Sequence, residues 1–345
     1  MVTMPTANSA KRYVVTGAAG FIGSRFAASC DLSLQRKLGL KDPKPIELIS
    51  VDHLEHFRSR SEHAGIDFGQ RLDRNRLIEW LSDPQSPKVD AVVHLGACTD
   101  TTCQDHDTLE RMNFLYTKHL WDLCALKNIP LVYASSAAVY GGGEKGYDDA
   151  DTLTPKLKPL NPYGDSKLKF DLYALDSEKR GVRPPVWAGF RFFNVFGPGE
   201  RHKNKMSSVV IQAFDQIKKS GRVRLFRSHK DGIADGHQKR DFIFVDDVVR
   251  VLHFTLDRKV ERGVFNLGTG QARTFLDLAT AVFGALGKEP AFDWVDTPET
   301  IRNAYQYFTE AKMARLRTPG IAGFDRHFTA LEDAVDKYVR FLSAS

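Results

Sequence analysis

The sequence predicts an α/β fold of the Rossmann type: a doubly wound parallel sheet with a smaller, interleaved C-terminal substrate lobe. Two observations predict it. Short apolar runs bounded by turn signals alternate with helical segments, which is typical of parallel strands buried on both faces. The first of these runs, residues 13–16, leads directly into Gly17, Gly20 and Gly23, which open a helix.

The first strand and helix form the expected start of a dinucleotide fold. The strand at residues 13–16 precedes a helix that is expected to run to about Cys30. A surface insertion at residues 37–45 then separates this helix from the next strand.

Further buried strands follow, and each ends in residues that carry chemistry. These strands are expected at residues 46–51, 91–95, 131–135 and 187–195. The residues at or just past their ends are Asp52, Gly96, Ser136 and Asn194. Because open α/β sheets bind ligands at the carboxyl ends of their strands, this placement predicts one site built from all four ends.

After Pro198 the pattern changes to shorter elements and a basic, glycine-containing loop at residues 229–239. The elements expected there are a strand and helix within residues 241–256, a strand at 264–267 and a helix at 275–286. We therefore expect a Rossmann domain of residues 1–193 plus about 241–258, and a substrate lobe of about 194–240 and 259–345.

Composition favours an ordinary globular protein of 345 residues, with 42% hydrophobic and 27% charged side chains. No apolar run is long enough to span a membrane, and residues 1–10 are expected to be a frayed extension rather than a secretion signal. The four cysteines form neither a C-x-x-C pair nor a metal-ligand cluster, which favours reduced thiols in the cytoplasm and no bound metal. The net charge of +6 is spread along the chain and favours an anionic small molecule over nucleic acid.

Asp52 is the main indicator of cofactor type. At the end of the second strand it is placed to hydrogen-bond an adenosine ribose, although a strand-end aspartate also commonly caps a turn. A carboxylate there favours NAD because it repels a 2′-phosphate. Arg58 and Arg60 follow shortly and could bind that phosphate, so the residues themselves leave NAD and NADP open.

Tyr163 and Lys167 predict hydride and proton transfer at a carbinol carbon. Four residues make one helical turn, so the ammonium is expected near the phenol, where a cation favours the phenolate. Ser136 is expected to hydrogen-bond the same substrate oxygen. The motif Tyr-x-x-x-Lys alone is a weak indicator of this chemistry. It becomes a specific one because it follows the glycine turn and Ser136 in this order along the chain.

These motifs resemble those of the extended short-chain dehydrogenase/reductases and, among them, the ADP-L-glycero-D-manno-heptose 6-epimerases. The resemblance covers nearly the whole chain. It rests on the glycine turn, Ser136, Tyr163, Lys167 and the segments 94–102, 133–138, 190–198, 202–206, 239–242, 265–270 and 305–309. It implies an enzyme, an isomerase of lipopolysaccharide biosynthesis, that inverts C6 of an ADP-heptose through transient oxidation by bound NADP, with NAD as the other option. It also implies a homo-oligomer.

Residue roles follow from this resemblance. Tyr163 and Lys203 would be the acid/base pair, Lys167 would orient the nicotinamide ribose, and Ser136 would position the reacting oxygen. The implied cofactor-binding residues are Gly17, Gly20, Phe21, Ile22, Gly23, Asp52, His53, Arg58, Leu95, Gly96, Ala97, Cys98, Thr99, Asn113, Lys167 and Val195. The implied substrate-binding residues are Ser136, Asn194, Phe226, Arg240 and Tyr305.

Alternatives remain for some of these residues. Spacing alone favours Lys203 as one of a solvated basic run with Arg201 and Lys205, or as a phosphate ligand. Arg240 could instead form a structural ion pair with Asp246 or Asp247. Lys205 and Gln212 replace a serine and a histidine of some family members, which leaves substrate detail open there.

Other functions are also compatible with part of the pattern. A UDP-hexose 4-epimerase is the nearest alternative, and a non-catalytic cofactor-binding protein is more distant, since Tyr163 and Lys167 are both present. A 4,6-dehydratase would need an acid pair where this chain has Ala137 and Ala138.

Overall fold

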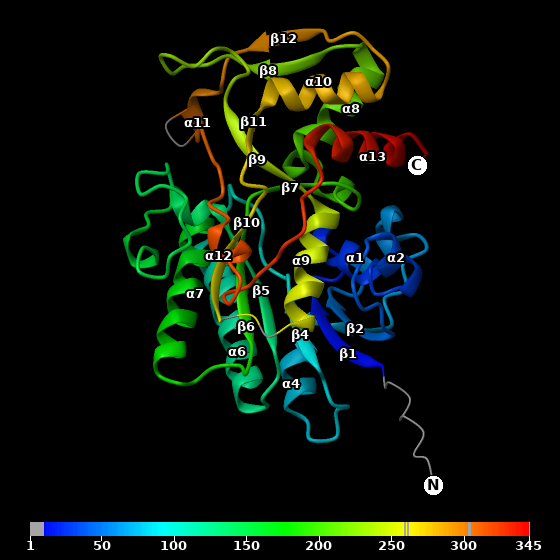
Figure 1. Ribbon diagram of the computed structural model, residues 1–345, viewed down its shortest axis with the longest axis vertical. Coiled ribbons are helices and arrows are strands. Elements are labelled where there is room, and N and C mark those ends of the chain that lie inside the picture. The colour runs from blue at the N-terminus through cyan, green and yellow to red at the C-terminus, as the bar shows by residue number, and fades with distance from the viewer. Residues whose placement is uncertain (1–9, 259, 261, 303–304, 345) are drawn as a thin grey trace.

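The computed structural model describes residues 10–258, 260, 262–302 and 305–344. Its centre is a seven-stranded, wholly parallel sheet in the order β3-β2-β1-β4-β5-β6-β10, which is the Rossmann order extended by one strand. The strands are β1 (Lys11–Thr16), β2 (Ile46–Asp52), β3 (Gln70–Asp73), β4 (Ala91–His94), β5 (Leu131–Ser136), β6 (Trp187–Phe192) and β10 (Gly263–Leu267). The predicted fold class is therefore confirmed (Figure 1).

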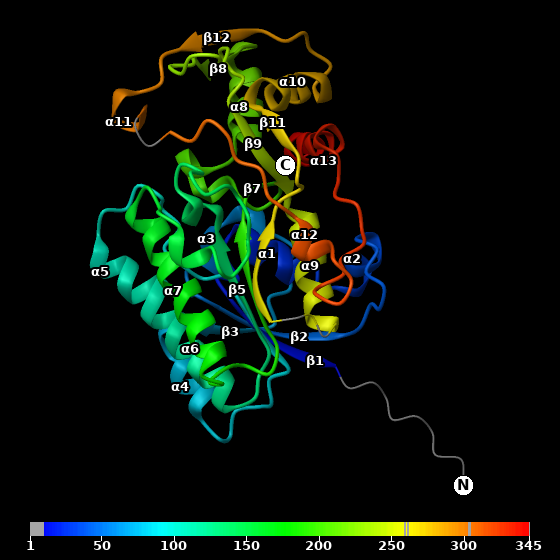
Figure 2. The ribbon, with the colours of Figure 1, turned by 60° about the vertical axis from the view of Figure 1, so that its left-hand side comes forward.

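Helices cover both faces of this sheet, as Figure 2 shows. Because successive side chains of a strand point to opposite faces, Val15 of β1 packs in the same core as Phe26, while the neighbouring Val14 packs with Trp121. The helical elements of this part of the chain are α1 (Phe21–Ala28), α2 (Leu32–Lys37), α3 (His56–Ser59), α4 (Leu77–Ser82), α5 (His106–Leu109), α6 (Tyr116–Leu126), α7 (Pro162–Lys179) and α9 (Val245–Asp257), with the shorter turns η1 (Ser61–His63), η2 (Arg74–Arg76), η3 (Glu110–Leu115), η4 (Ala137–Tyr140) and η5 (Thr154–Lys156).

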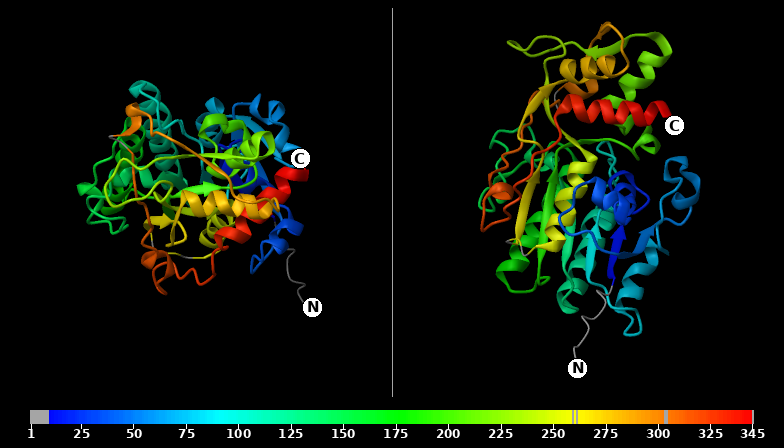
Figure 3. Two further views of the ribbon diagram at one scale, coloured as in Figure 1. Left: turned by 90° about the horizontal axis from the view of Figure 1, so that it is seen from above. Right: turned by 45° about the vertical axis from the view of Figure 1, so that its right-hand side comes forward.

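A smaller lobe lies beyond the carboxyl ends of the strands (Figure 1). It contains a three-stranded sheet of β7 (Asn194–Phe196), β9 (Lys239–Phe244) and β11 (Ala272–Thr274), and a pair of β8 (Val223–Phe226) and β12 (Phe292–Val295). Its helical elements are η6 (Arg201–Met206), α8 (Val209–Ser220), α10 (Phe275–Ala285), α11 (Glu299–Arg302) and α13 (Leu331–Ala344), while the short α12 (Ala314–Arg317) packs beside β10. Figure 3 shows α13 lying across the base of the lobe, where it joins the core formed by α8 and α10.

Two sequence expectations need correction. The run at residues 187–195 is not one strand, because at Phe193 the chain leaves the large sheet and β7 pairs with β9 of the lobe. The expected lobe of residues 259–345 contains β10, which instead pairs with β6 in the large sheet. Conversely, β9 belongs to the small sheet, so the division near residue 241 falls inside a strand.

Asp241 holds three separate segments of the chain together. Its buried carboxylate accepts hydrogen bonds from the backbone N–H groups of Thr269 at 2.7 Å, Gly270 at 2.9 Å and Ala311 at 3.0 Å. A side chain at position 268 would collide with this carboxylate, so Gly268 is required there. These bonds fix β9 from the side opposite its neighbour Arg240, since adjacent strand residues face opposite ways.

A buried ion pair anchors α7 to the sheet. Nε of Arg191 in β6 lies 2.9 Å from Oδ2 of Asp171, and both side chains are fully buried. Asp171 also accepts a hydrogen bond from Ser135, and Arg191 donates to Tyr140 and Thr154. Asp171 lies one helical turn beyond Lys167, so the pair fixes the helix that carries Tyr163 and Lys167.

Replacing Arg191 by methionine is expected to lower the free energy of unfolding by about 3–5 kcal/mol, because Asp171 would be left charged and unpaired in the core. Denaturant titration measures this loss. Arg180→Met is the matched control, since Arg180 pairs with Asp176 at the exposed end of the same helix and such a pair contributes about 0–1 kcal/mol. Equal losses in the two variants would contradict the expectation.

No helix among the described residues is long and apolar enough to cross a membrane. The extension expected at residues 1–10 lies, apart from Ala10, outside the described part of the chain.

Candidate active site

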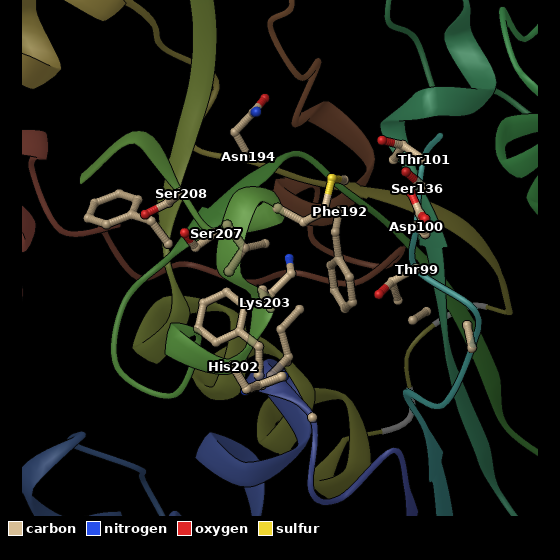
Figure 4. Close-up of a pocket in the computed structure, with 18 of the residues that line it drawn as sticks. Thr99, Asp100, Thr101, Ser136, Phe192, Asn194, His202, Lys203, Ser207 and Ser208 are labelled. Atoms are coloured by element: carbon tan, nitrogen blue, oxygen red, sulfur yellow. The ribbon is translucent and has the colours of Figure 1, made fainter. Parts of the chain in front are cut away.

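A large pocket lies between the carboxyl ends of the sheet strands and the lobe. Its volume is about 1060 Å³, and it is lined by the ends of β1, β2, β4, β5 and β6 as well as by η6, α8, β8 and β9. All four predicted catalytic residues and all five predicted substrate-binding residues line this one pocket. Figure 4 shows part of it, with Lys203 on one side and Ser136 with Thr99–Thr101 on the other.

The glycine turn lines the pocket at the switch point of the sheet, between β1 and β4, and packs too closely there for any side chain. Gly17 has a φ of +65°, and a Cβ on it would lie 2.6 Å from the backbone nitrogen of Gly96. A Cβ on Gly23 would collide with the carbonyl oxygen of Gly17. Gly20 caps α1 without a side chain, so the amides of its first turn remain available to an anion. These features fit a pyrophosphate.

Asp52 lines the pocket, but its carboxylate is already engaged in shaping the turn. It accepts hydrogen bonds from the backbone N–H groups of Ala19 at 3.0 Å and His53 at 2.8 Å, and Oδ1 lies 2.9 Å from Nδ1 of His56. Asp52 therefore caps the turn, and this role is compatible with an additional contact to a ribose.

Of the predicted cofactor residues, four do not line the pocket: His53, Arg58, Cys98 and Asn113. His53 and Arg58 are exposed. Asn113 is buried behind the loop, where its side chain bonds the backbone N–H and carbonyl of Cys98, so it supports the pocket wall without reaching the cavity. The other twelve predicted cofactor residues line the pocket.

In place of Arg58, three other basic residues lie beside Asp52 in the pocket: His56, Arg60 and Arg74. Arg60 also donates a hydrogen bond to the carbonyl of Ala19 in the glycine turn. Arg74 follows the end of β3, and its Nε is buried without a hydrogen-bond partner among the described residues. Sequence reasoning missed Arg74 because β3, with the sequence QRLD, has no apolar run to mark it as a strand.

Tyr163 and Lys167 enter the pocket from the first turns of α7. Asn161 caps this helix by accepting a hydrogen bond from the N–H of Gly164, with Pro162 at the first helical position. Both side chains are buried, and Nζ of Lys167 donates to the carbonyl of Ala134 at 2.9 Å.

The expected activation of Tyr163 by Lys167 is not found in the protein alone. Burial raises the pKa of Tyr163, and the opposing influence is a hydrogen bond from Ser136. Burial also lowers the pKa of Lys167 to about 8, although nearby Asp171 favours its charged form.

Lys203 extends from η6 into the pocket (Figure 4). Its ammonium lies 5.6 Å from the ring centroid of Phe21, the first residue of α1. Burial lowers the pKa of Lys203, and the carboxylate of Glu200 works in the opposite direction. A lysine with a lowered pKa can give and take protons closer to neutrality than a solvated one.

Arg240 is a buried cation that faces the lobe side of the pocket. Its guanidinium lies between two aromatic rings, 5.5 Å from the centroid of Phe275 and 5.4 Å from that of Tyr305. Burial lowers its pKa, and no carboxylate among the described residues pairs with it. The alternative of a structural ion pair is wrong, because Asp246 pairs with Arg25 and Asp247 pairs with Arg250.

The remaining predicted substrate residues surround Arg240. The ring of Phe226 packs edge-on against Tyr305, with centroids 6.2 Å apart, and Asn194 is exposed to the cavity (Figure 4). Lys205 and Gln212, the two departures from the family pattern, also line the pocket. Among the described residues, no cluster of histidine, cysteine and acidic side chains could hold a metal ion.

The fold and site together define a class of protein: a Rossmann-type enzyme in which a buried tyrosine and lysine line a pocket between the large sheet and a smaller lobe. The chain belongs to the NAD dependent epimerase/dehydratase family, whose model matches residues 13–268. Its cofactor is accordingly a nicotinamide dinucleotide.

Within this family the chain is similar to proteins named ADP-L-glycero-D-manno-heptose-6-epimerase. It is 41% identical to the one from Fusobacterium nucleatum over 341 residues, which cover 95% of this chain and 96% of that protein. It is 43% identical to the one from Nitratidesulfovibrio vulgaris over 335 residues, or 96% and 98% of the two chains. The resemblance predicted from the motifs is confirmed.

Solved structures share the fold. The Helicobacter pylori ADP-L-glycero-D-manno-heptose-6-epimerase has a TM-score of 0.74 at 22% identity and covers 99% of this chain and 100% of its own. The Thermus thermophilus UDP-glucose 4-epimerase in complex with NAD has a TM-score of 0.73 at 23% identity, covering 97% and 99%.

Proposed function

We propose that this protein is an ADP-L-glycero-D-manno-heptose 6-epimerase. It inverts C6 of ADP-D-glycero-β-D-manno-heptose through transient oxidation by bound NADP, and so supplies the heptose of the lipopolysaccharide inner core. The identity of 41–43% to proteins of that name over nearly the whole chain supports the substrate. The structural observation that carries the proposal is Lys203, a partly desolvated lysine that reaches the pocket from the side opposite Ser136.

Inversion of a carbinol explains why two proton-handling groups are needed. The carbinol oxygen is presented in two orientations, and a single tyrosine on one side cannot easily serve both. Bound NADP supplies the acceptor and donor of the hydride. Tyr163, hydrogen-bonded to Ser136, holds and moves the proton in one orientation, and Lys203 does so in the other.

Two other functions fit less well. A UDP-hexose 4-epimerase would also invert a carbinol with Tyr163 and Lys167, but the relatives that are 41–43% identical over nearly the whole chain are named for the heptose reaction. A non-catalytic cofactor-binding protein gives no reason for Tyr163, Lys167 and Lys203 lining one cavity. Neither is favoured by a specific observation.

Incubating the purified protein with ADP-D-glycero-D-manno-heptose, and separately with UDP-glucose, tests the proposal. NMR is expected to resolve both C6 epimers of the heptose, with no turnover of the hexose. Turnover of the hexose alone would assign the 4-epimerase instead.

Bound NADP, rather than NAD, is supported by His56, Arg60 and Arg74 beside Asp52. A 2′-phosphate there would meet the guanidinium groups of Arg60 and Arg74, which offset the repulsion from the carboxylate, and Nε of Arg74 has no hydrogen-bond partner among the described residues. Mass spectrometry of the nucleotide released by denaturation is expected to find NADP, and release of NAD would contradict this.

Arg240 is proposed to bind the pyrophosphate of the substrate, because it is a buried guanidinium free of any carboxylate partner among the described residues. Arg240→Gln is expected to raise KM about 10- to 100-fold, since a charge-assisted bond contributes about 1.5–3 kcal/mol, while cofactor content stays constant. Steady-state kinetics measures the change. Arg222→Gln is the control, because Arg222 forms an exposed pair with Asp293 and neither residue lines the pocket. An unchanged KM in Arg240→Gln would remove this residue from the substrate site.

A further inference from the structure

We infer that Glu62 and His202 form a clasp that positions Lys203 against the cofactor turn. The clasp is a pair of contacts that His202 makes with one carboxylate oxygen, Oε1 of Glu62. The ring Nδ1 of His202 hydrogen-bonds this oxygen, and the backbone N–H of His202 donates to it at 3.3 Å. It joins η1, which follows the second strand of the Rossmann domain, to η6, which carries Lys203. The inference rests on the proposed role of Lys203.

The clasp is shielded from solvent. The side chain of Glu62 is 10% exposed and that of His202 is 18% exposed. Burial would raise the pKa of Glu62, but the bonds and charge of His202 outweigh it and leave this pKa below its usual value. A desolvated, two-point contact of this kind constrains geometry more tightly than an exposed pair.

The shape of the η6 segment has a separate cause. The buried carboxylate of Glu200 accepts hydrogen bonds from the backbone N–H of Gly197 at 3.2 Å and from both the N–H and the hydroxyl of Ser208. These contacts close the loop between positions 197 and 208 upon itself. They do not attach it to the cofactor-binding domain, so its location relative to that domain depends on contacts such as the clasp.

On the other side, the segment of Glu62 is itself tied to the glycine turn. Arg60 donates to the carbonyl of Ala19, while Asp52 accepts from the N–H of the same residue. The contacts therefore run from the glycine turn through Arg60 to Glu62 and His202. They return through Lys203, whose ammonium lies over the ring of Phe21, the first residue of the helix that this turn opens. A displacement at Glu62 would move Lys203 relative to the bound nicotinamide dinucleotide, although neither Glu62 nor the His202 backbone needs to touch substrate.

Glu62 and His202 are thus positioning residues, and Glu62→Leu removes the acceptor at nearly constant size. It is expected to lower kcat about 10- to 100-fold, as misplacement of a reacting group does, with KM and bound cofactor within about twofold of wild type. Glu62→Gln, which keeps an acceptor oxygen, is expected to restore most of the activity. Asp215→Asn is the matched control, because it removes only the exposed pair with Arg201, the residue next to His202, and is expected to act like wild type.

A double-mutant cycle separates positioning from a general structural role. If Glu62 acts through Lys203, adding Glu62→Leu to Lys203→Met lowers the residual rate no further than Lys203→Met alone. A further loss, or loss of bound cofactor in Glu62→Leu, would overturn the inference, as would wild-type kcat in that variant. If wild type inverts no heptose but turns over a UDP-hexose, the proposed function fails, and the same variants measured with that hexose still decide on the clasp.

Discussion

Replacing Lys203 by methionine is expected to remove most epimerisation, about 10²- to 10⁴-fold in kcat, because the pocket loses one of its two proton-handling groups. Bound cofactor is expected to stay, since the glycine turn and α7 are untouched. The measurements are the rate of C6 inversion and the nucleotide released from denatured protein.

Arg201→Met is the control for this variant, because Arg201 is a neighbouring cation on the same segment that does not line the pocket. A near wild-type rate in Lys203→Met would show that Lys203 is not an acid/base. A loss equal in the two variants would point to the local charge rather than to the lysine.

Tyr163→Phe is expected to reduce inversion by a similar factor, about 10²- to 10⁴-fold, in both directions. The phenyl ring fills the same buried position, so loss of the hydroxyl removes the proton-handling oxygen while the packing is kept. Inversion is measured from each epimer separately.

Tyr173→Phe on the same helix is the comparison, because its hydroxyl bonds Asp122 outside the pocket. It is expected to retain activity. If Tyr163→Phe inverted C6 as fast as Tyr173→Phe, another base would have to remove the hydroxyl proton as the hydride leaves. Lys203 would be the first candidate for that base.

The central sheet was predictable because most of its strands are buried on both faces and therefore read as apolar runs. β3 was missed because it is a polar edge strand. The break between β6 and β7 was missed for the opposite reason: Phe193 continues the apolar run, and only the pairing of residues 194–196 with β9, far along the chain, marks the exit from the large sheet.

The site was predictable where local backbone geometry dictates it, as in the glycine turn and the helical pair Tyr163 and Lys167. It was less predictable where the direction of a side chain decides whether a residue reaches the pocket. Arg58 lies in the last turn of α3 and is exposed, whereas Arg60, two residues later in extended backbone, reaches the glycine turn. The contact between Glu62 and His202 joins residues 140 positions apart, and no local pattern marks it.

Asp241 has a consequence for how this enzyme can diversify. By bonding the chain at Thr269 and Gly270 on one side and at Ala311 on the other, it closes a loop that contains β11, α10, β12 and α11. The two ends of this loop are therefore held at a single carboxylate, although the residues at those ends lie about forty positions apart in the chain. Phe275 and Tyr305, the rings on either side of Arg240, both lie inside it. Substitutions at these pocket-facing positions are therefore expected to change substrate preference while Asp241 keeps the two ends of the loop in place.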